Sequence, residues 1–218
     1  MIVPNALRAS ALFAREWVSK PGAVGAICPS SRRLAMQIAR QVPAGDGLVI
    51  ELGGGTGTVT QALLESGVTP ERLIVVERAP AFVHHLRNRF PDVPVVHGDA
   101  ARLAHFLPPD VRIDAIVSCL PLRSLPRHET AVIVEQWHQV LGENGVVIQF
   151  TYDIRPLRYI AAYHPDFVIC SSRIVWANAP PARVVTTCKR ATVASDRPVG
   201  AGHQHSRSAV EIKSRSQS

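Results

Sequence analysis

A glycine-rich stretch with an acidic residue just before it is the part of this sequence best suited to hold a ligand. It contains, in order, Gly53, Gly54, Gly55, Thr56 and Gly57. Glu51 lies two positions before the first glycine, directly after the apolar run 48–50. Glycines let a backbone turn sharply and approach a ligand closely. A dinucleotide-binding fingerprint would need a glycine where Thr58 stands, and a carboxylate suits a cationic group, so we expect the amino end of an aminoacyl ligand here.

Two further acidic residues follow short apolar runs later in the chain. Glu77, which is followed by Arg78, comes 26 residues after Glu51, where a carboxylate can hold both hydroxyls of a ribose. Asp99, which is followed by Ala100, can accept a hydrogen bond from an adenine amino group. Each acid also has a structural interpretation, Glu77 as a surface acid at a helix start and Asp99 as an N-cap.

Alternating strands and helices are needed to bring these residues together, and the hydrophobic pattern predicts them. Short, branched, almost purely apolar runs predict strands at 47–52, 73–77, 93–97, 113–119 and 145–152. The segments between them predict helices at 57–66, 80–90, 100–106 and 127–141. This alternation predicts an α/β fold with a doubly wound, mostly parallel sheet, in which the three acids lie at the carboxyl ends of adjacent strands.

The two ends of the chain depart from this alternation. Towards the C-terminus we expect a short helix at 155–163 and an antiparallel hairpin of strands 167–177 and 182–190, which makes seven strands in all. N-terminal helices are predicted at 6–18 and from a serine N-cap to about Val42. The predicted regions are N-terminal helices (1–46), an α/β domain (47–190) and a disordered basic tail rich in serine and arginine (191–218).

Composition and charge narrow the classes of function. With 46% apolar residues the chain can bury a core, so disorder of the whole chain is excluded. The net charge of +7 is concentrated in residues 1–50 and 191–218, which suggests a lipid surface or a nucleic acid as partner, with ordinary solubility as the alternative. No apolar run approaches the ~20 residues that span a bilayer, and the start has no secretory pattern.

The potential metal ligands and thiols show no framework in the sequence. The four cysteines are far apart and form no C-x-x-C pair, so we expect reduced thiols in a cytoplasmic protein, and neither a disulfide frame nor a zinc site. The pair His84-His85 and the run His203-Gln204-His205 lack further ligands at metal-site spacing. We therefore expect no metal.

The glycine-rich stretch and the three acids resemble those of the class I S-adenosylmethionine-dependent methyltransferases, over about residues 47–190. The terminal hairpin also matches that family's seven-stranded sheet. The resemblance implies S-adenosyl-L-methionine as the cofactor. It also implies that Glu51 and the glycine-rich stretch lie near the methionine part, Glu77 on the ribose and Asp99 near the adenine.

The end of the fourth predicted strand bears on the methyl acceptor. Enzymes that methylate the exocyclic amine of adenine resemble this region but carry Asn-x-Pro-Tyr or Asn-x-Pro-Phe there, where the Asn accepts from the amine and the ring stacks on the base. The matching positions here are Cys119, Leu120, Pro121 and Leu122. A flat base would lose a stacking platform worth roughly 1–3 kcal/mol, so the site favours a non-planar, aliphatic amine.

A second resemblance covers about residues 7–190. The stretches 17–35, 118–122 and 149–152 are similar to those of the bacterial phospholipid N-methyltransferases, which usually carry Gly where this chain has Cys119. This resemblance implies methyl transfer to the amine of phosphatidylethanolamine, ultimately giving phosphatidylcholine. Ornithine-lipid N-methyltransferases look much alike. An RNA adenine N6-methyltransferase, or a protein that binds the cofactor without turnover, is a further alternative.

Several residues are then expected to meet the lipid. The segment 6–18 can lie flat in a bilayer interface, with aromatic anchors and arginines near the headgroups. The expected substrate-facing or membrane-facing residues are Arg8, Phe13, Trp17, Ser30, Ser31, Leu122 and Tyr159. We expect a cytoplasmic protein that binds the inner face of an anionic membrane peripherally, with a phospholipid substrate and without a nucleic-acid partner.

Methyl transfer itself asks little of the side chains. The amine must first lose a proton, since its pKa lies near that of lysine, roughly 10, and a polar pocket must then hold it in line. Tyr152 is the first catalytic candidate, by hydroxyl contact or cation–π attraction to the amine. Cys119 and Pro121 lie at the matching acceptor positions. A packed ring is the alternative interpretation for Tyr152.

Overall fold

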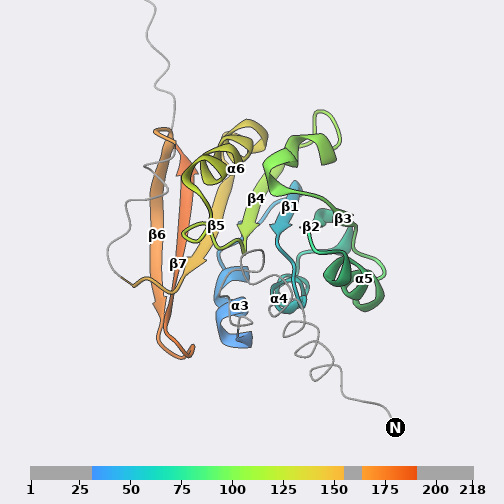
Figure 1. Ribbon diagram of the computed structural model, residues 1–218, viewed down its shortest axis with the longest axis horizontal. Coiled ribbons are helices and arrows are strands. Elements are labelled where there is room, and N and C mark those ends of the chain that lie inside the picture. The colour runs from blue at the N-terminus through green and yellow to red at the C-terminus, as the bar shows by residue number, and fades with distance from the viewer. Residues whose placement is uncertain (1–30, 155–163, 191–218) are drawn as a thin grey trace, which may run out of the picture.

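A seven-stranded sheet runs through the computed structural model, which describes residues 31–154 and 164–190 (Figure 1). Its strands are β1 (Leu48–Leu52), β2 (Leu73–Glu77), β3 (Val95–His97), β4 (Ile113–Ser118), β5 (Val146–Thr151), β6 (Phe167–Val175) and β7 (Ala182–Lys189). Their order in the sheet is β3-β2-β1-β4-β5-β7-β6. The first five strands are parallel, and β7 is antiparallel to both of its neighbours. The predicted sheet with its terminal hairpin is confirmed.

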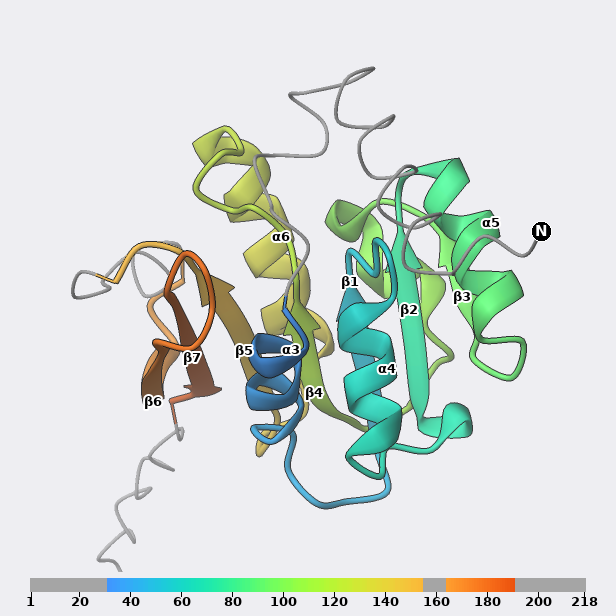
Figure 2. The same ribbon diagram turned by 90° about the horizontal axis from the view of Figure 1, so that it is seen from below.

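Helices cover both faces of this sheet (Figure 2). They are α3 (Arg32–Ala39), α4 (Thr58–Glu65), α5 (Pro80–Arg89) and α6 (Arg127–Val140), with the 3-10 segments η1 (Pro70–Arg72) and η2 (Ala100–Phe106). One face packs against α3, α4 and α5, and the other against α6 and η2. Successive side chains of β1 point to opposite faces of the sheet: Val49 packs in the cluster on the first face and Ile50 in the cluster on the second. Strands covered on both sides need apolar residues throughout, which explains their unbroken apolar runs.

The helix α3 joins the expected N-terminal region to the core of the α/β domain. Ser31 caps this helix, because its hydroxyl oxygen accepts a hydrogen bond from the amide of Leu34 at 3.2 Å. Leu34 and Ile38 are fully buried in the cluster that also holds residues of β1 and α4. The described part of region 1–46 therefore shares one core with residues 47–190. The predicted helices at 6–18 and 155–163 and the tail at 191–218 lie outside the described residues.

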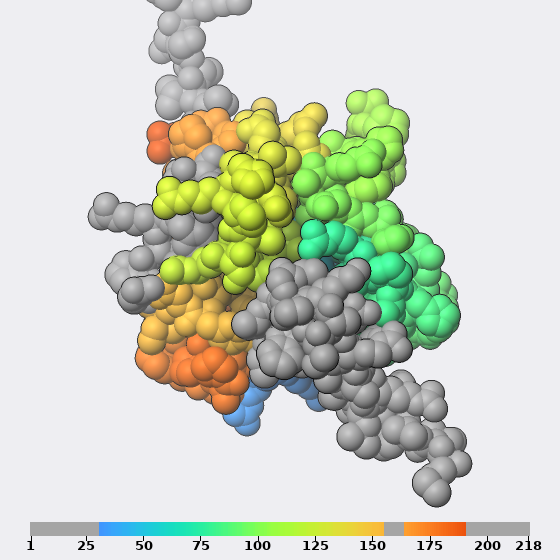
Figure 3. All heavy atoms as spheres, in the orientation of Figure 1, coloured from blue at the N-terminus to red at the C-terminus, as the bar shows by residue number. Residues whose placement is uncertain are grey.

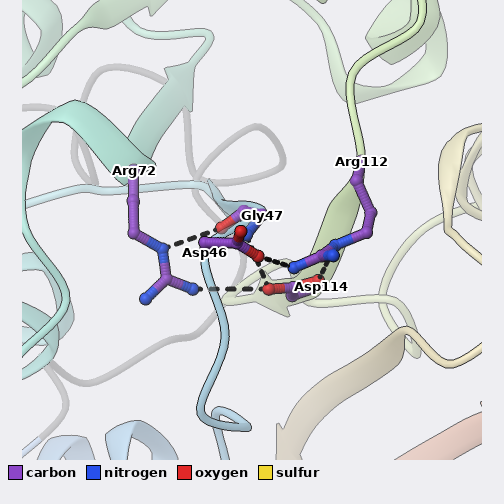
Figure 4. A network of polar contacts seen from close by, with 5 residues as sticks. All are labelled: Asp46, Gly47, Arg72, Arg112 and Asp114. Carbon is purple, nitrogen blue, oxygen red and sulfur yellow. Dashed lines mark hydrogen bonds and ion pairs between the residues drawn. The ribbon is translucent and has the colours of Figure 1, made fainter.

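A polar network connects the amino ends of β1 and β4, at the edge opposite their carboxyl ends (Figure 4). Arg72 donates a hydrogen bond to the carbonyl of Gly47 at 2.9 Å and another to Asp114 at 3.4 Å. Asp114 also accepts from the amide of Gly47 at 2.8 Å and from Arg112 at 2.9 Å. Arg112 pairs in addition with the exposed Asp46. Because the carboxylate of Asp114 is largely buried, its bonds hold the strand ends together more firmly than exposed ion pairs would.

The cysteines require one correction to the sequence-based expectations. Cys170 in β6 and Cys188 in β7 form a disulfide, with their Cα atoms 6.1 Å apart, so the prediction of reduced thiols was wrong for this pair. The two strands are antiparallel neighbours, and the register between them shifts between Ile169 and Ser171. Such a pairing depends on strand register, which the spacing of cysteines along the sequence does not reveal. Cys119 is a free thiol.

Candidate active site

The glycine-rich turn connects β1 to α4 at the carboxyl edge of the sheet. The amide of Gly53 donates to the carbonyl of Val76 in β2 at 2.8 Å, and the amide of Gly57 donates to the carbonyl of Gly54 at 2.8 Å. Gly55 has a φ of +52°, and no atom lies within 4 Å of the place where its Cβ would be. A side chain at Gly55 would be strained and would occupy the open space in front of the turn. The backbone is therefore both fixed and accessible here.

Thr56, at the tip of this turn, is held by a residue that the sequence analysis did not single out. Arg89 of α5 donates a hydrogen bond to the carbonyl of Thr56 at 2.7 Å. The hydroxyl of Thr56 lies 3.2 Å from that of Thr58. Arg89 is 33 residues away in the chain, so only the packing of α5 beside the turn reveals this contact.

Glu51 lies fully buried at the end of β1, behind the turn. Its Oε2 accepts a hydrogen bond from the hydroxyl of Thr60 on α4 at 2.7 Å, and its Oε1 has no partner among the described residues. Burial raises the pKa of Glu51 to about 8, although the bond from Thr60 lowers it; the nearby Glu77 carboxylate adds to the rise. A cationic group beside the carboxylate would oppose this rise and satisfy the second oxygen.

Glu77, at the end of β2, closes the turn from the other side. Its two oxygens accept hydrogen bonds from the amide of Gly55 at 3.0 Å and from the amide of Ala79 at 2.8 Å. The carboxylate thus connects the turn to the start of α5, but the interpretation of Glu77 as a surface acid was wrong, because its side chain is buried. An ionised carboxylate has about four acceptor positions, so Glu77 keeps acceptor capacity for the hydroxyls of a ligand.

Asp99 follows β3 and caps η2, because its Oδ1 accepts a hydrogen bond from the amide of Ala101 at 2.9 Å. Its Oδ2 lies 3.8 Å from Nη1 of Arg78, and both of these side chains are about half exposed. An exposed ion pair of this kind contributes little and can exchange partners. The N-cap interpretation is therefore confirmed. Ala100, the first residue of η2, is buried.

The loop after β4 lies beside the glycine-rich turn at the same edge. A Cβ added to Gly53 would come within 3.2 Å of the side chain of Leu120. The amide of Cys119 bonds to the carbonyl of the last residue of β1 at 2.9 Å. Across Pro121, the amide of Leu122 donates to the carbonyl of Leu120 at 2.9 Å, and the proline ring restricts the backbone in the middle of this tight turn. The predicted acceptor positions and the turn are therefore neighbours.

Two further side chains hold this acceptor loop in place. Gln149 in β5 donates from Nε2 to the carbonyl of Leu120 at 3.0 Å, and Thr130 on α6 donates to the carbonyl of Leu122 at 3.1 Å. Gln149 is buried, and its Oε1 has no partner among the described residues. Leu122 is buried in the core cluster that includes α6, so its contact with a substrate stays a prediction. Gln149 stood out in the sequence only as part of the stretch 149–152, since its contact depends on the pairing of β4 with β5.

The chain is similar to known methyltransferases over most of its length. A family described as a methyltransferase domain matches residues 49–145. An ornithine lipid N-methyltransferase of Singulisphaera acidiphila is 32% identical over 177 residues, which cover 78% of this chain and 91% of that protein. The chain belongs to the class I S-adenosylmethionine-dependent methyltransferases.

Other relatives of this methyltransferase differ in their acceptors. A probable ribosomal RNA small subunit methyltransferase A of Haloarcula marismortui is 30% identical over 156 residues, which cover 65% of this chain but 51% of that protein. The solved glycopeptide N-methyltransferase MtfA, complexed with S-adenosyl-L-homocysteine, matches with a TM-score of 0.60 at 13% identity, over 77% of this chain and 94% of that chain. At such low identity the second match shows the shared fold.

S-adenosylmethionine is the cofactor of this family, and the described residues fit it. The unpaired Oε1 of Glu51 suits the ammonium group of the methionine part, and the spare acceptor positions of Glu77 suit the ribose hydroxyls. Asp99 lies one strand further along, where we expect the adenine. These three contacts stay predictions. When bound, the cofactor supplies a methyl group already activated by its sulfonium, so the protein has to orient the two reactants and exclude water.

Cys119 has an environment that limits what its thiol can do. Burial, together with the charges of Glu51 and Glu77, raises the pKa of Cys119 well above the usual value for a thiol. The thiol therefore stays protonated near neutral pH and supplies neither a thiolate base nor a nucleophile. The catalytic role that stays predicted for Cys119 is therefore contact with the methyl acceptor through an uncharged side chain.

The other predicted residues are only partly covered by the structure. Tyr152 follows β5 directly, is partly buried, and meets the ring of Phe150 edge to face at 5.8 Å. Ser31 is the N-cap of α3, and its contact with a substrate stays a prediction. Arg8, Phe13, Trp17, Ser30 and Tyr159 lie outside the described residues. Within the described ranges, no helix has the length and apolar character needed to cross a membrane.

Proposed function

We propose that this methyltransferase transfers methyl groups to the primary aliphatic amine of a membrane lipid. Phosphatidylethanolamine is the first candidate acceptor and ornithine lipid is the second. The similarity to the ornithine lipid N-methyltransferase supports the lipid class, because the match covers nearly all of that protein. The similarity to ribosomal RNA methyltransferases supports the alternative less, because it covers about half of those proteins.

The observation that carries the proposal is the apolar acceptor loop after β4. Cys119, Leu120, Pro121 and Leu122 offer no aromatic ring on which a nucleobase could stack. The carbonyl of Leu120 already accepts from the side chain of Gln149, and the carbonyl of Leu122 already accepts from Thr130. A flat base would therefore find no stacking platform in the loop, whose own side chains include no amide. An aliphatic amine needs only one polar contact at its nitrogen and suits an apolar loop better.

The amine must arrive at the site without its extra proton. An ammonium group has no lone pair, and its pKa lies roughly near 10 in water. Partly buried, apolar surroundings disfavour the charged form and lower that pKa. Because the thiol of Cys119 stays neutral, we assign the proton to solvent and keep the hydroxyl of Tyr152 as the contact that orients the nitrogen.

Labelled methyl transfer from S-adenosylmethionine tests the proposal directly. Vesicles of phosphatidylethanolamine and of ornithine lipid, each with and without anionic lipid, are compared with phosphatidylcholine vesicles, which offer no primary amine. Ribosomal RNA serves as the parallel acceptor. Label in mono-, di- or trimethylated lipid is expected, and Glu77→Ala should abolish it if the activity belongs to this chain. Label in RNA alone would refute the proposal.

Peripheral membrane binding by residues 6–18 is a separate part of the proposal. Trp17→Glu should abolish flotation with anionic vesicles, because it places a charge at an interfacial anchor. The affinity for S-adenosyl-L-homocysteine, measured by calorimetry, should stay unchanged. Flotation equal to that of the wild type would remove this segment as the membrane anchor.

A further inference from the structure

A cluster of metal-ligating side chains lies away from the active site, where α6 ends and β6 begins. Glu135 and His138 are on neighbouring turns of α6, and His164 precedes β6. One ligand atom from each of these three residues lies within 4.8 Å of the others. Figure 3 shows the last part of α6 (yellow) beside the start of the β6 segment (orange) on the surface of the molecule.

The contacts inside the cluster pair each imidazole with a carboxylate. His164 Nε2 lies 3.5 Å from Oε2 of Glu135, and His138 Nε2 lies 3.4 Å from Oδ2 of Asp166. The two imidazole rings stack with centroids 3.9 Å apart and planes 21° apart. Below them, the buried ring of Phe167 meets both imidazoles edge to face. One carboxylate and two imidazoles thus lie together beside the ring of Phe167, and the carboxylate of Asp166 contacts His138.

The geometry of the cluster suits a metal, because one ligand atom from each of two imidazoles and a carboxylate already lies within 4.8 Å of the others. A neutral imidazole has the lone pair that a metal requires. A divalent cation bound there would also offset the negative charges of the carboxylates that contact the two rings.

We propose that Glu135, His138 and His164, with Asp166 as a fourth ligand, form a binding site for a divalent transition-metal ion of the zinc class. Two imidazoles and carboxylate oxygens are a donor set that zinc accepts, whereas magnesium prefers oxygen ligands and octahedral geometry. Sequence spacing did not predict this site, because two ligands come from α6 and two from the segment before β6. The expectation of no metal rested on histidine runs elsewhere in the chain.

Metal binding requires a defined local rearrangement. Tetrahedral zinc, with bonds of about 2.0–2.2 Å, places its ligand atoms roughly 3.3 Å apart, closer than the 4.8 Å limit that encloses the three present ones. A metal lies in the plane of each imidazole it binds, so the two stacked rings must turn apart. The amide of Asp166 now donates to Nδ1 of His164 at 3.3 Å, and this contact opens when Nδ1 takes the proton and Nε2 binds the metal.

The position of the cluster indicates what the metal does. Phe167 pairs with Lys189, and Val146 at the start of β5 pairs with Cys188, so the cluster lies at the amino edge of β5. Glu51 and Glu77 lie at the carboxyl edges of their strands. The metal therefore fastens α6 to the start of β6 and takes no part in the methyl transfer.

Metal titration of the full chain, with any affinity tag removed, tests the proposal. Zinc binding is measured by calorimetry, and bound cobalt by its visible absorption, for the wild type, His138→Gln and Glu135→Gln. His128→Gln is the matched control, because His128 is an exposed histidine on the same helix. We expect the wild type to bind one zinc ion per chain. The zinc affinity should be at least tenfold lower in the two cluster variants and unchanged in the control. Zinc should also raise the midpoint of thermal unfolding of the wild type and of His128→Gln only.

Two results of the zinc titrations would overturn the proposed metal site. Equal zinc affinity and equal thermal stabilisation in the wild type and in both cluster variants would overturn the proposal, because the metal would then bind elsewhere on this histidine-rich chain. If His138→Gln does not fold, Glu135→Gln decides alone, since the Glu135 side chain is 65% exposed. Absence of zinc binding by the wild type would also overturn the proposal.

Discussion

The two halves of the active site are built in opposite ways. On the side of β1 and β2, buried carboxylates make the contacts: Glu51 accepts from the hydroxyl of Thr60, nine residues away, and Glu77 accepts from the amide of Gly55, 22 residues away. On the side of β4 and β5, the loop is apolar, and Leu120 is held by Gln149, which is 29 residues away. The cofactor half is therefore marked in the sequence by a short glycine-rich segment, although contacts from Glu77 and Arg89 complete it. The acceptor half depends on which strands lie side by side.

The difference extends to ionisation. The cofactor half contains a carboxylate whose pKa is raised to about 8 and which has one unpaired oxygen, so it is poised to respond to a cationic ligand. The acceptor half contains a thiol that stays neutral. Substitutions in the first half should change cofactor binding and its pH dependence, whereas substitutions in the second should change turnover.

The largest effect is expected from Glu51→Gln, measured as the pH dependence of unfolding. The raised pKa means that the folded state holds a proton that the unfolded state releases above about pH 4.5. Stability is therefore fully present below that pH and is lost as the pH rises towards 8. Glu51→Gln should remove this loss, which is on the order of a few kcal/mol. Denaturant unfolding from pH 5 to 9 measures the difference, and parallel profiles for the two proteins would contradict it.

Glu51→Gln should also change cofactor binding. Whereas the stability of the wild type falls as the pH rises, its affinity for the cofactor should increase. In the wild type, an ammonium group beside Glu51 favours the ionised carboxylate, so the affinity for S-adenosyl-L-homocysteine should rise from pH 6 to 8. In Glu51→Gln the affinity should be lower and nearly independent of pH. Calorimetry in two buffers of different ionisation enthalpy would also show the proton released on binding.

Glu77→Ala is expected to weaken cofactor binding at least tenfold. The substitution leaves the amides of Gly55 and Ala79 without their acceptor, and it removes the expected partner of the ribose. Glu71→Ala is the control, because Glu71 is an exposed acid in η1, just before β2. A binding constant for S-adenosyl-L-homocysteine that matches the wild type would remove Glu77 from the cofactor site.

Gln149→Leu separates the two halves. The hydrogen bonds from Nε2 to the carbonyls of Leu120 and Phe150 are lost. This loss should lower kcat roughly threefold to tenfold and leave the affinity for S-adenosyl-L-homocysteine unchanged. Thr187→Val is a matched control, since Thr187 is another buried polar residue paired with β5. A parallel loss of cofactor affinity in Gln149→Leu would show that the halves are not independent.

The smallest effect is expected from Asp99→Ala. Its carboxylate is about half exposed and its ion pair with Arg78 is long, so cofactor affinity should fall by only about fivefold, near the ~1 kcal/mol cost of a lost N-cap. Asp92→Ala, an exposed acid before β3, controls for the change in charge. A loss as large as that of Glu77→Ala would place Asp99 among the main cofactor contacts.

The same contrast explains how much of the molecule the sequence could predict. The strands, the turn at 53–57 and the capping of α3 by Ser31 follow from local patterns, and all agree with the structure. The disulfide between Cys170 and Cys188 and the loop contact made by Gln149 depend on strand register and sheet order. Hydrophobic periodicity alone determines neither the exact register nor the order of the strands.

The residues of the acceptor loop also show what a local sequence pattern cannot predict. Leu122 was predicted to face a substrate because of its place in a motif, yet it packs in the core with α6. The loop itself follows the fourth strand as predicted and lies next to the glycine-rich turn. The direction of each side chain within that loop depends on Pro121 and on the bonds made by Thr130 and Gln149, and only the folded chain contains that information.

The order β5-β7-β6 has a consequence for the growing chain (Figure 1). The strand made last among those described is inserted between two that were made earlier, so β6 has no direct partner in β5. While a ribosome has released the chain only as far as residue 175, β5 therefore keeps an unpaired edge, and β6 has nothing to pair with. Closure of the sheet is a late event in synthesis and waits for residues 182–189 to emerge.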